Sequence, residues 1–195
     1  MPLNTLKLLK SGFPSALLSN LYGPTETTVD AIYWIFGEDI EKLEEVPLGN
    51  PCANHRVLFL DEQEKQVTVE DEIAEICIAG PGVALGYWKD AETTRTAFIA
   101  SPESEKQDEV IYKTGDLGYR SSKDGLIYMT GRKDNQFKHY GYRIEAGEIE
   151  NALNQFEFIL QSCVLYDCEK KRIQAFYTAD KLASPPPFRN LLSGI

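Results

Sequence analysis

The sequence predicts a mixed α+β fold, in which a series of short strands forms a distorted β-barrel or sheet and a small α/β unit follows. Strand-like runs bounded by Gly, Pro and Asp turns fill most of the chain before Gly131, without the regular strand and helix alternation of βαβ units. After Gly131 the pattern changes to an amphipathic helix and two strands. We therefore expect domains at 1–132 and 133–182, then a proline-containing tail at 183–195.

The elements before Gly131 follow from local composition. Residues 3–10 resemble the end of a helix, which stops near Gly12-Phe13-Pro14. Apolar, β-branched and aromatic runs predict strands, and polar runs between them predict loops. The expected strands lie at 16–21, 29–36, 55–60, 72–79 and 110–113, and the expected loops at 38–45, 61–65 and 101–109.

Capping and turn residues predict the remaining elements. Asp90 can cap a helix over 90–98, and Asp124-Gly125 is a pair typical of a hairpin turn within 119–128. In the last part, apolar residues at i, i+3, i+4 and i+7 predict a helix over 146–156. Strands at 159–166 and 172–178 complete the small α/β unit.

Composition excludes some partners. The chain has 195 residues, 43% of them hydrophobic, and 20 basic against 30 acidic residues give a net charge of −10. This charge disfavours nucleic acid and anionic membranes as partners. The four cysteines and two histidines lack the spacing of a zinc site, and Cys77 lies in an apolar run typical of a core. No stretch has the character of a signal peptide or the length of a membrane span, so we expect a cytoplasmic location.

Residues 20–26, Asn-Leu-Tyr-Gly-Pro-Thr-Glu, are the most informative run. Tyr22 offers an aromatic face, Thr25 a hydroxyl and Glu26 a carboxylate suited to a magnesium ion. These three groups suit a nucleotide through base stacking, phosphate contact and metal binding. The alternative for the run alone is a solvated turn after a strand.

Three further segments resemble motifs of one superfamily when they are taken in order with this run. They are Glu75-Ile-Cys-Ile-Ala-Gly-Pro-Gly-Val-Ala-Leu-Gly-Tyr87, Tyr112-Lys-Thr-Gly-Asp-Leu117 and Gly131-Arg-Lys-Asp-Asn-Gln-Phe-Lys138 with the following Gly141–Glu150. Together the four segments resemble the adenylate-forming superfamily, and most closely the adenylation domains of non-ribosomal peptide synthetases (NRPS). The resemblance covers roughly residues 10–180.

This resemblance implies a ligase that activates an amino acid with ATP, forming an acyl-adenylate and pyrophosphate and then a thioester on a phosphopantetheinyl carrier protein. The resemblance also implies which residues bind ATP and AMP. Tyr22 and Gly23 would flank adenine, Thr25 would bind the α-phosphate, Glu26 would hold Mg²⁺, Asp116 would accept from both ribose hydroxyls, and Arg132 would support the ribose or a phosphate.

The resemblance also assigns a hinge and a substrate pocket. Asp134 matches the hinge of a C-terminal lid, and Lys138 and the Gly141 loop would approach the active site in the thioester-forming pose, although a solvated strand lysine is the alternative for Lys138. Leu21, Val29 and Asp30 would line the amino-acid pocket, where Asp30 would need a partner if buried. Their combination resembles pockets for small hydroxy amino acids such as serine, and some pockets for basic amino acids.

Three departures from the family pattern affect the expected activity. A Gly/Ser/Thr-rich phosphate loop ending in Lys-Gly is not found in these residues, Ser193-Gly194-Ile195 is not the Gly-Lys motif with its adenylating lysine, and Leu85 replaces the arginine of Ala-Arg-Gly-Tyr. We therefore expect a fragment of a ligase: the later part of the large domain with part of the lid, and no adenylation by the 195 residues alone.

Other readings remain open. Within the enzymes, the alternatives are fragments of a D-alanine, acyl-CoA or aryl-CoA ligase. A split enzyme completed by another chain that supplies the missing N-terminal part is a further possibility, since unpaired edges favour association. The non-enzymatic alternative is a degenerate nucleotide-binding or interaction module that keeps Tyr22, Glu26 and Asp116.

Overall fold

Short antiparallel strands dominate the computed structural model, which describes residues 3–37, 40, 43–102, 109–168 and 170–180. Contacts between residues divide the chain into two units, Met1–Lys133 and Asp134–Ile195. The division falls next to the expected boundary at Lys133-Asp134, while the assignment of the units to a large domain and a lid stays a prediction. The predicted tail at 183–195 lies outside the described residues.

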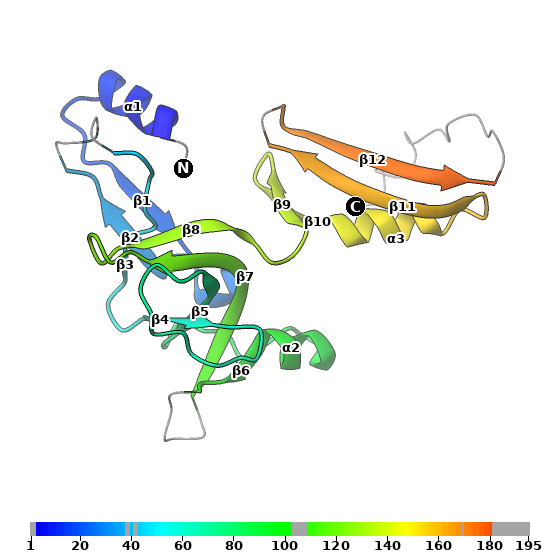
Figure 1. Ribbon diagram of the computed structural model, residues 1–195, viewed down its shortest axis with the longest axis horizontal. Coiled ribbons are helices and arrows are strands. Elements are labelled where there is room, and N and C mark those ends of the chain that lie inside the picture. Colours follow the sequence, from blue (N-terminus) through cyan, green and yellow to red (C-terminus); the bar gives the residue numbers. More distant parts are fainter. Residues whose placement is uncertain (1–2, 38–39, 41–42, 103–108, 169, 181–195) are drawn as a thin grey trace. The chain divides into compact units, whose positions relative to one another are not determined.

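The first unit begins with a helix and a small antiparallel sheet (Figure 1). Leu6 of the helix is fully buried and packs with Phe36 and Ile40. The strand order in the sheet is β1-β2-β3. The elements are α1 (Leu3–Gly12), β1 (Ser19–Tyr22), the 3₁₀ helix η1 (Thr25–Thr27), β2 (Ile32–Ile35) and β3 (Asn50–Pro51).

A five-stranded sheet forms the rest of the first unit. Its order is β4-β5-β7-β6, with β8 paired to β7, and all pairings are antiparallel. Every residue of β5 is buried, so this apolar strand forms the centre of the unit. The strands are β4 (Arg56–Leu60), β5 (Ala74–Ala79), β6 (Phe98–Ala100), β7 (Val110–Arg120) and β8 (Ile127–Arg132).

Strand β7 continues beyond the predicted end at Lys113, and Figure 1 shows it curving through the unit. Its register against β5 shifts between Glu75 and Cys77, where residues 114–116 face Ile76 alone. Such a bulge bends a strand and redirects its side chains. The Thr-Gly-Asp segment is therefore a bulge inside a strand and not a turn.

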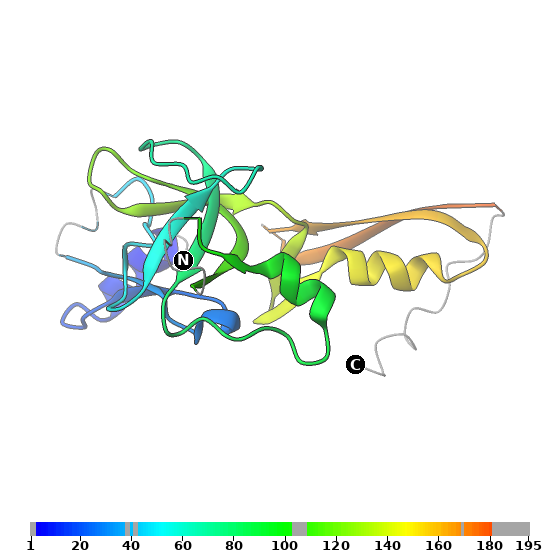
Figure 2. The ribbon, with the colours of Figure 1, turned by 90° about the horizontal axis from the view of Figure 1, so that it is seen from below.

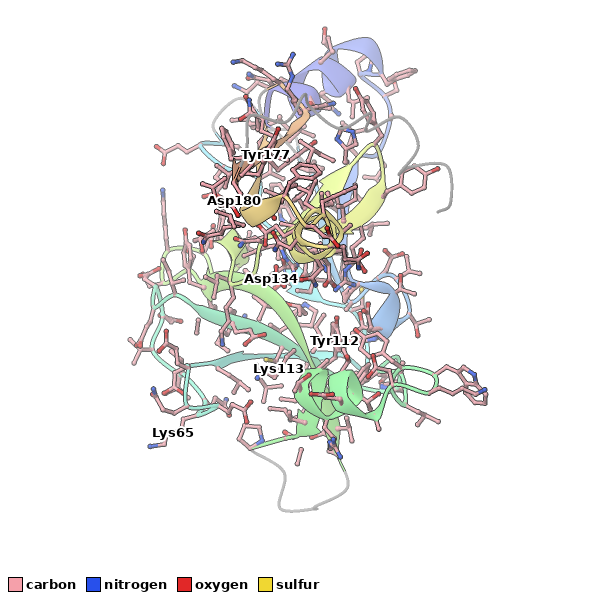
Figure 3. All side chains as sticks on the ribbon, turned by 90° about the vertical axis from the view of Figure 1, so that its right-hand side faces the viewer. Lys65, Tyr112, Lys113, Asp134, Tyr177 and Asp180 are labelled. Carbon is pink, nitrogen blue, oxygen red and sulfur yellow. The ribbon has the colours of Figure 1, made fainter. Side chains whose placement is uncertain are left out.

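The predicted turn and helix cap of this unit are confirmed. Gly125 adopts a φ of 73° in the hairpin between β7 and β8, a conformation that costs glycine little. Helix α2 (Ala91–Ala97) starts after Asp90, whose carboxylate accepts a hydrogen bond from the backbone N–H of Thr93 at 3.0 Å. The side chains of the neighbours Tyr112 and Lys113 on β7 can be followed in Figure 3.

The second unit contains a hairpin, a helix and a two-stranded sheet. Helix α3 lies along the sheet (Figure 2), where Ala146 and Leu153 pack against Ile159 and Val164. The Glu150 carboxylate also accepts a hydrogen bond from the backbone N–H of Val164 at 2.7 Å. The elements are β9 (Gln136–His139), β10 (Tyr142–Glu145), α3 (Ala146–Asn154), β11 (Ile159–Asp167) and β12 (Arg172–Ala179).

The mixed α and β composition agrees with the predicted class, while closure of the first unit into a barrel stays a prediction. Three strands start at least two residues later than predicted: β1 at Ser19, β2 at Ile32 and β5 at Ala74. Strand β2 begins late because Thr28 and Val29 have φ values of 61° and 74°, which a strand cannot contain. Cys77 is buried as expected, and all four cysteines are free thiols. Within the described part of the chain, no helix is both long and apolar enough to span a bilayer.

Candidate nucleotide-binding site

The run from Tyr22 to Val29 forms a tight, strained connection after β1. A side chain on Gly23 would place its Cβ only 2.2 Å from the backbone oxygen of Val29, so only glycine fits there. Val29 itself has a φ of 74°, which is unusual for a β-branched residue. The surrounding backbone bonds, including Ala31 N–H to Tyr22 O at 2.9 Å, hold this conformation.

Asp116 brings together three of the predicted motifs. Its Oδ2 accepts a hydrogen bond from the Tyr22 hydroxyl, and its Oδ1 accepts one from Arg132 Nη1. The guanidinium also donates to the backbone oxygen of Thr114 at 3.2 Å. Strands β7 and β8 make this possible because Asp116 and Arg132 are direct partners in their register. The residues predicted to flank adenine and hold ribose therefore lie in one cluster.

This cluster retains capacity for a ligand. Each carboxylate oxygen can accept two hydrogen bonds, so both Asp116 oxygens can still accept one from a hydroxyl. Burial raises the pKa of Tyr22 far above its ordinary value, and the neighbouring negative charge of Asp116 raises this pKa further. Tyr22 therefore stays protonated and remains a donor to Asp116 at neutral pH.

Glu26 forms a second pair of a tyrosine and a carboxylate. Its side chain is buried and its Oε1 accepts a hydrogen bond from the Tyr87 hydroxyl at 2.6 Å. The Tyr87 hydroxyl lies 3.5 Å from that of Tyr112, and Phe98 packs between the two rings, with centroids 5.5 and 5.0 Å away. Burial, followed by the hydrogen bond to Glu26, raises the pKa of Tyr87 far above its ordinary value. Tyr87 therefore stays protonated at neutral pH and can donate to Glu26.

The surroundings of Glu26 fit a single-carboxylate magnesium site. Mg²⁺ in nucleotide sites is commonly held by one or two carboxylates together with phosphates and water. Glu26 supplies a buried, oriented carboxylate, and the backbone bond from Ala84 N–H to Glu26 O at 2.8 Å fixes its chain position. Across the described ranges, no group of three or more His, Cys, Asp or Glu residues gathers in a way that could hold a metal without a substrate.

The residues predicted to contact phosphate and amino acid are on the surface of the first unit. Thr25 is exposed at the start of η1, and Leu21 and Val29 are 55% and 62% exposed. Asp30 is exposed too, so the cost of burying its charge does not arise. All four side chains are thus exposed in the described residues.

The remaining predicted residues belong to the second unit. Asp134 is exposed, and its Oδ1 accepts a hydrogen bond from the backbone N–H of Gln136 at 3.1 Å. Lys138 is exposed on β9 opposite Arg143 of β10, and Gly141 has a φ of 90° in the turn between these strands.

Sequence reasoning gave no role to three supporting residues: Tyr87, which holds Glu26, and Glu75 and Thr114, which hold the bulge that carries Asp116. Tyr87 was noted only as part of a motif. Glu75 carried a signal, since it is a charged residue in the otherwise apolar run Ala74–Ala79. Thr114 had no signal, because its hydroxyl acts only through the bulge, where it accepts a hydrogen bond from the Asp116 N–H at 3.0 Å.

Comparisons with known proteins agree with this geometry. The family model for AMP-binding enzymes matches residues 1–88. The chain is 41% identical over 152 residues to tyrocidine synthase 2 of Brevibacillus parabrevis, covering 78% of this chain and 4% of that protein. It is 40% identical over 178 residues to bacitracin synthase 1 of Bacillus licheniformis, covering 90% of this chain and 3% of that protein.

The fold is similar to that of a solved structure. PA1221, an NRPS protein containing adenylation and PCP domains, superposes with a TM-score of 0.79 at 29% identity. The match covers 95% of this chain and 37% of that chain, so these 195 residues span far less than two thirds of each relative.

The motifs, the fold and these similarities are those of the AMP-binding family of enzymes. Within that family, the chain belongs to the adenylation domains of the non-ribosomal peptide synthetase type.

Proposed function

We propose that residues 1–195 form part of a ligase that activates an amino acid with ATP and transfers it to a carrier protein. The observation that carries the proposal is the hydrogen-bonded cluster of Tyr22, Asp116 and Arg132, which joins three separate sequence motifs. This cluster would supply the adenosine side of the site. Because the relatives are much longer, further groups of the site would come from other parts of the ligase.

In this proposal the cluster binds the ribose of ATP or AMP. Asp116 accepts hydrogen bonds from the two vicinal ribose hydroxyls, while the Tyr22 ring flanks adenine and its hydroxyl keeps the carboxylate oriented. Arg132 neutralises the buried carboxylate, which would otherwise be costly to desolvate. Because the carboxylate is held before the ligand arrives, binding requires little further ordering of the protein.

Glu26 and Thr25 would contact the phosphates of ATP. Glu26 would hold Mg²⁺, which neutralises charge on the phosphates, and Thr25 at the adjacent surface would donate its hydroxyl to the α-phosphate. Tyr87 orients the Glu26 carboxylate for this task. These residues would therefore orient the Glu26 carboxylate and the metal ion. The in-line attack of the amino-acid carboxylate on the α-phosphate would need further groups of the ligase.

The amino acid would lie against Leu21, Val29 and Asp30. These exposed side chains are two apolar residues and one carboxylate, and Leu21 directly precedes Tyr22 in the chain. This combination supports a serine-like substrate, in which a short polar side chain meets Asp30. Asp134 would be the hinge of the second unit, and Lys138 with the Gly141 turn would act when the thioester forms on the phosphopantetheine of the carrier.

Isothermal titration calorimetry of the 195-residue chain with AMP and with ATP, with and without Mg²⁺, tests the proposal. We expect AMP to bind without metal and ATP to bind more tightly when Mg²⁺ is present. Asp116→Asn should weaken AMP about tenfold or more, since hydrogen bonds to a charged acceptor are the stronger kind. Binding of AMP that is unaffected by this substitution would refute the ribose assignment, and a complete lack of nucleotide binding would favour the interaction module over any nucleotide-binding protein.

A further inference from the structure

Glu75 is a buried charge at the centre of the first unit. It lies on β5, whose residues are all buried, and only 5% of its surface is exposed. A carboxylate in such a place is costly unless hydrogen bonds or an opposite charge compensate it. Its partners therefore indicate what the residue does.

Those partners belong to the bulge that carries Asp116. Glu75 Oε1 accepts a hydrogen bond from the backbone N–H of Gly115 at 3.1 Å, and Oε2 lies 3.6 Å from Lys133 Nζ. The backbone oxygen of Gly115 accepts a hydrogen bond from the Lys133 N–H at 2.8 Å. Glu75 thus contacts both Gly115 of β7 and Lys133, the residue that follows β8, and these two residues are themselves joined by a backbone hydrogen bond.

The bulge depends on such side chains because it lacks regular ladder partners. Residues 114–116 face Ile76 alone, and Gly115 adopts a φ of 74°. The Thr114 hydroxyl donates to the Ile76 backbone oxygen at 2.7 Å and accepts from the Asp116 N–H, and Glu75 takes the Gly115 N–H. Without the Glu75 acceptor, the Gly115 N–H would be left unsatisfied in a partly buried place, and the bulge would rearrange.

We propose that Glu75 is a positioning residue for Asp116: it fixes the Gly115 bulge, and the bulge directs the Asp116 carboxylate toward Tyr22 and Arg132. The inference rests on the proposed function, since it affects ligand binding only if Asp116 holds the ribose. Glu75 itself touches no ligand. Its effect should therefore appear as a loss of preference for ribose hydroxyls and not as a general loss of affinity for adenine.

Two substitutions at Glu75 separate positioning from a general structural role. Glu75→Leu has a similar volume and removes the acceptor, whereas Glu75→Gln keeps an oxygen that can accept from Gly115 and removes only the charge. Calorimetry of the 195-residue chain with AMP and with 2′,3′-dideoxy-AMP gives the ribose preference as a ratio of affinities. We expect Glu75→Leu to lower this ratio at least about fivefold, as loss of a hydrogen bond to a charged group would, and Glu75→Gln to keep it within about twofold.

A Glu75→Leu protein that keeps the wild-type ratio would overturn the inference. Should that variant not fold, hydrogen exchange of the Gly115 amide in the wild-type chain decides the question. A wild-type Gly115 amide that is protected, and that stays protected in Glu75→Gln because the acceptor oxygen is kept, supports the Glu75 bond. An unprotected wild-type amide overturns it. Equal wild-type affinities for the two nucleotides would instead refute the ribose site of the proposed function, while the Gly115 amide would still report on Glu75.

Discussion

The Tyr22 hydroxyl donates a hydrogen bond to Asp116, although the two residues lie 94 positions apart in the chain. The same arrangement occurs again 61 positions apart, where the Tyr87 hydroxyl donates to Glu26. Both carboxylates proposed to meet the nucleotide or its metal are thus held by a tyrosine from another motif. A tyrosine ring is rigid and packs well, so it fixes a carboxylate at little entropic cost.

Removal of the Tyr22 hydroxyl should weaken nucleotide binding without changing the packing of the ring. For Tyr22→Phe we expect AMP affinity to fall about tenfold, because one of the two groups that orient Asp116 is lost. Calorimetry with AMP measures this effect. Tyr119→Phe is the matched control, since that ring stacks on Tyr128 with centroids 5.6 Å apart and has no place in the cluster. Equal losses in both variants would contradict the prediction.

Removal of the Tyr87 hydroxyl should affect the metal-dependent part of binding. Tyr87→Phe removes the 2.6 Å donor of Glu26, so the carboxylate is held less firmly. We expect Mg²⁺-dependent ATP affinity to fall about fivefold to tenfold and metal-free AMP affinity to stay within about twofold. Titrations with ATP and Mg²⁺ and with AMP alone give both values. A fall in AMP affinity as large as that in ATP affinity would show that Tyr87 does not act through Glu26.

The sequence allowed prediction of most elements whose pattern is local. Helix α1, the Asp90 cap and the Asp124-Gly125 hairpin each depend on neighbouring residues, and the structure confirms them. The start of β2 was predicted too early, because the strain at Val29 arises from the close approach of Gly23 to the Val29 backbone. Composition alone carries no sign of that contact.

In the candidate site, too, some residues could be predicted from the sequence and others could not. The motif residues Tyr22, Asp116 and Arg132 were predicted from the resemblance, and the structure brings them together. The supporting bonds from Tyr87 and Glu75 depend on a bulge and on tertiary contacts, which one sequence does not specify. A charged residue within an apolar strand pattern was the only available signal.

A side chain at position 23 should disrupt the strained connection. For Gly23→Ala the new Cβ would lie 2.2 Å from Val29 O and 2.8 Å from Ala31 N, both of them backbone atoms. We expect the free energy of unfolding to fall by more than about 1 kcal/mol, as substitutions incompatible with the native backbone do, and AMP affinity to fall with it. Urea denaturation followed by circular dichroism measures the first effect.

Gly12→Ala is the control for that substitution. Gly12 is the last residue of α1, and a Cβ there would meet no atom within 4 Å. Alanine at this position should leave stability unchanged within about 0.5 kcal/mol or raise it slightly. A Gly23→Ala protein as stable as Gly12→Ala would mean that the backbone around Val29 adapts, and that the connection is less constrained than the contacts indicate.

Alkaline pH should destabilise the first unit through two half-buried tyrosines, Tyr22 and Tyr87. An unfolded tyrosine has a pKa of about 10, whereas burial and the adjacent carboxylates raise the pKa of Tyr22 and Tyr87 well above that value in the folded chain. Above pH 10 the unfolded state therefore binds fewer protons than the folded state. The contribution of these two tyrosines to the free energy of unfolding is therefore complete below about pH 10. It is lost progressively as the pH rises further.

Urea denaturation at several pH values between about 8 and 11 measures this decrease, within the range where unfolded tyrosine titrates. The double variant Tyr22→Phe with Tyr87→Phe lacks both ionisable hydroxyls, so its stability should decline less steeply above pH 10 even if it is lower at pH 8. Tyr33→Phe is the control, because that residue is 38% exposed and replacing it should leave the slope unchanged. If the double variant and the wild-type chain lose stability at the same rate above pH 10, these two tyrosine–carboxylate pairs do not determine the alkaline limit. Other groups whose pKa is raised in the folded chain, such as Tyr128 and Lys113, would then have to account for it.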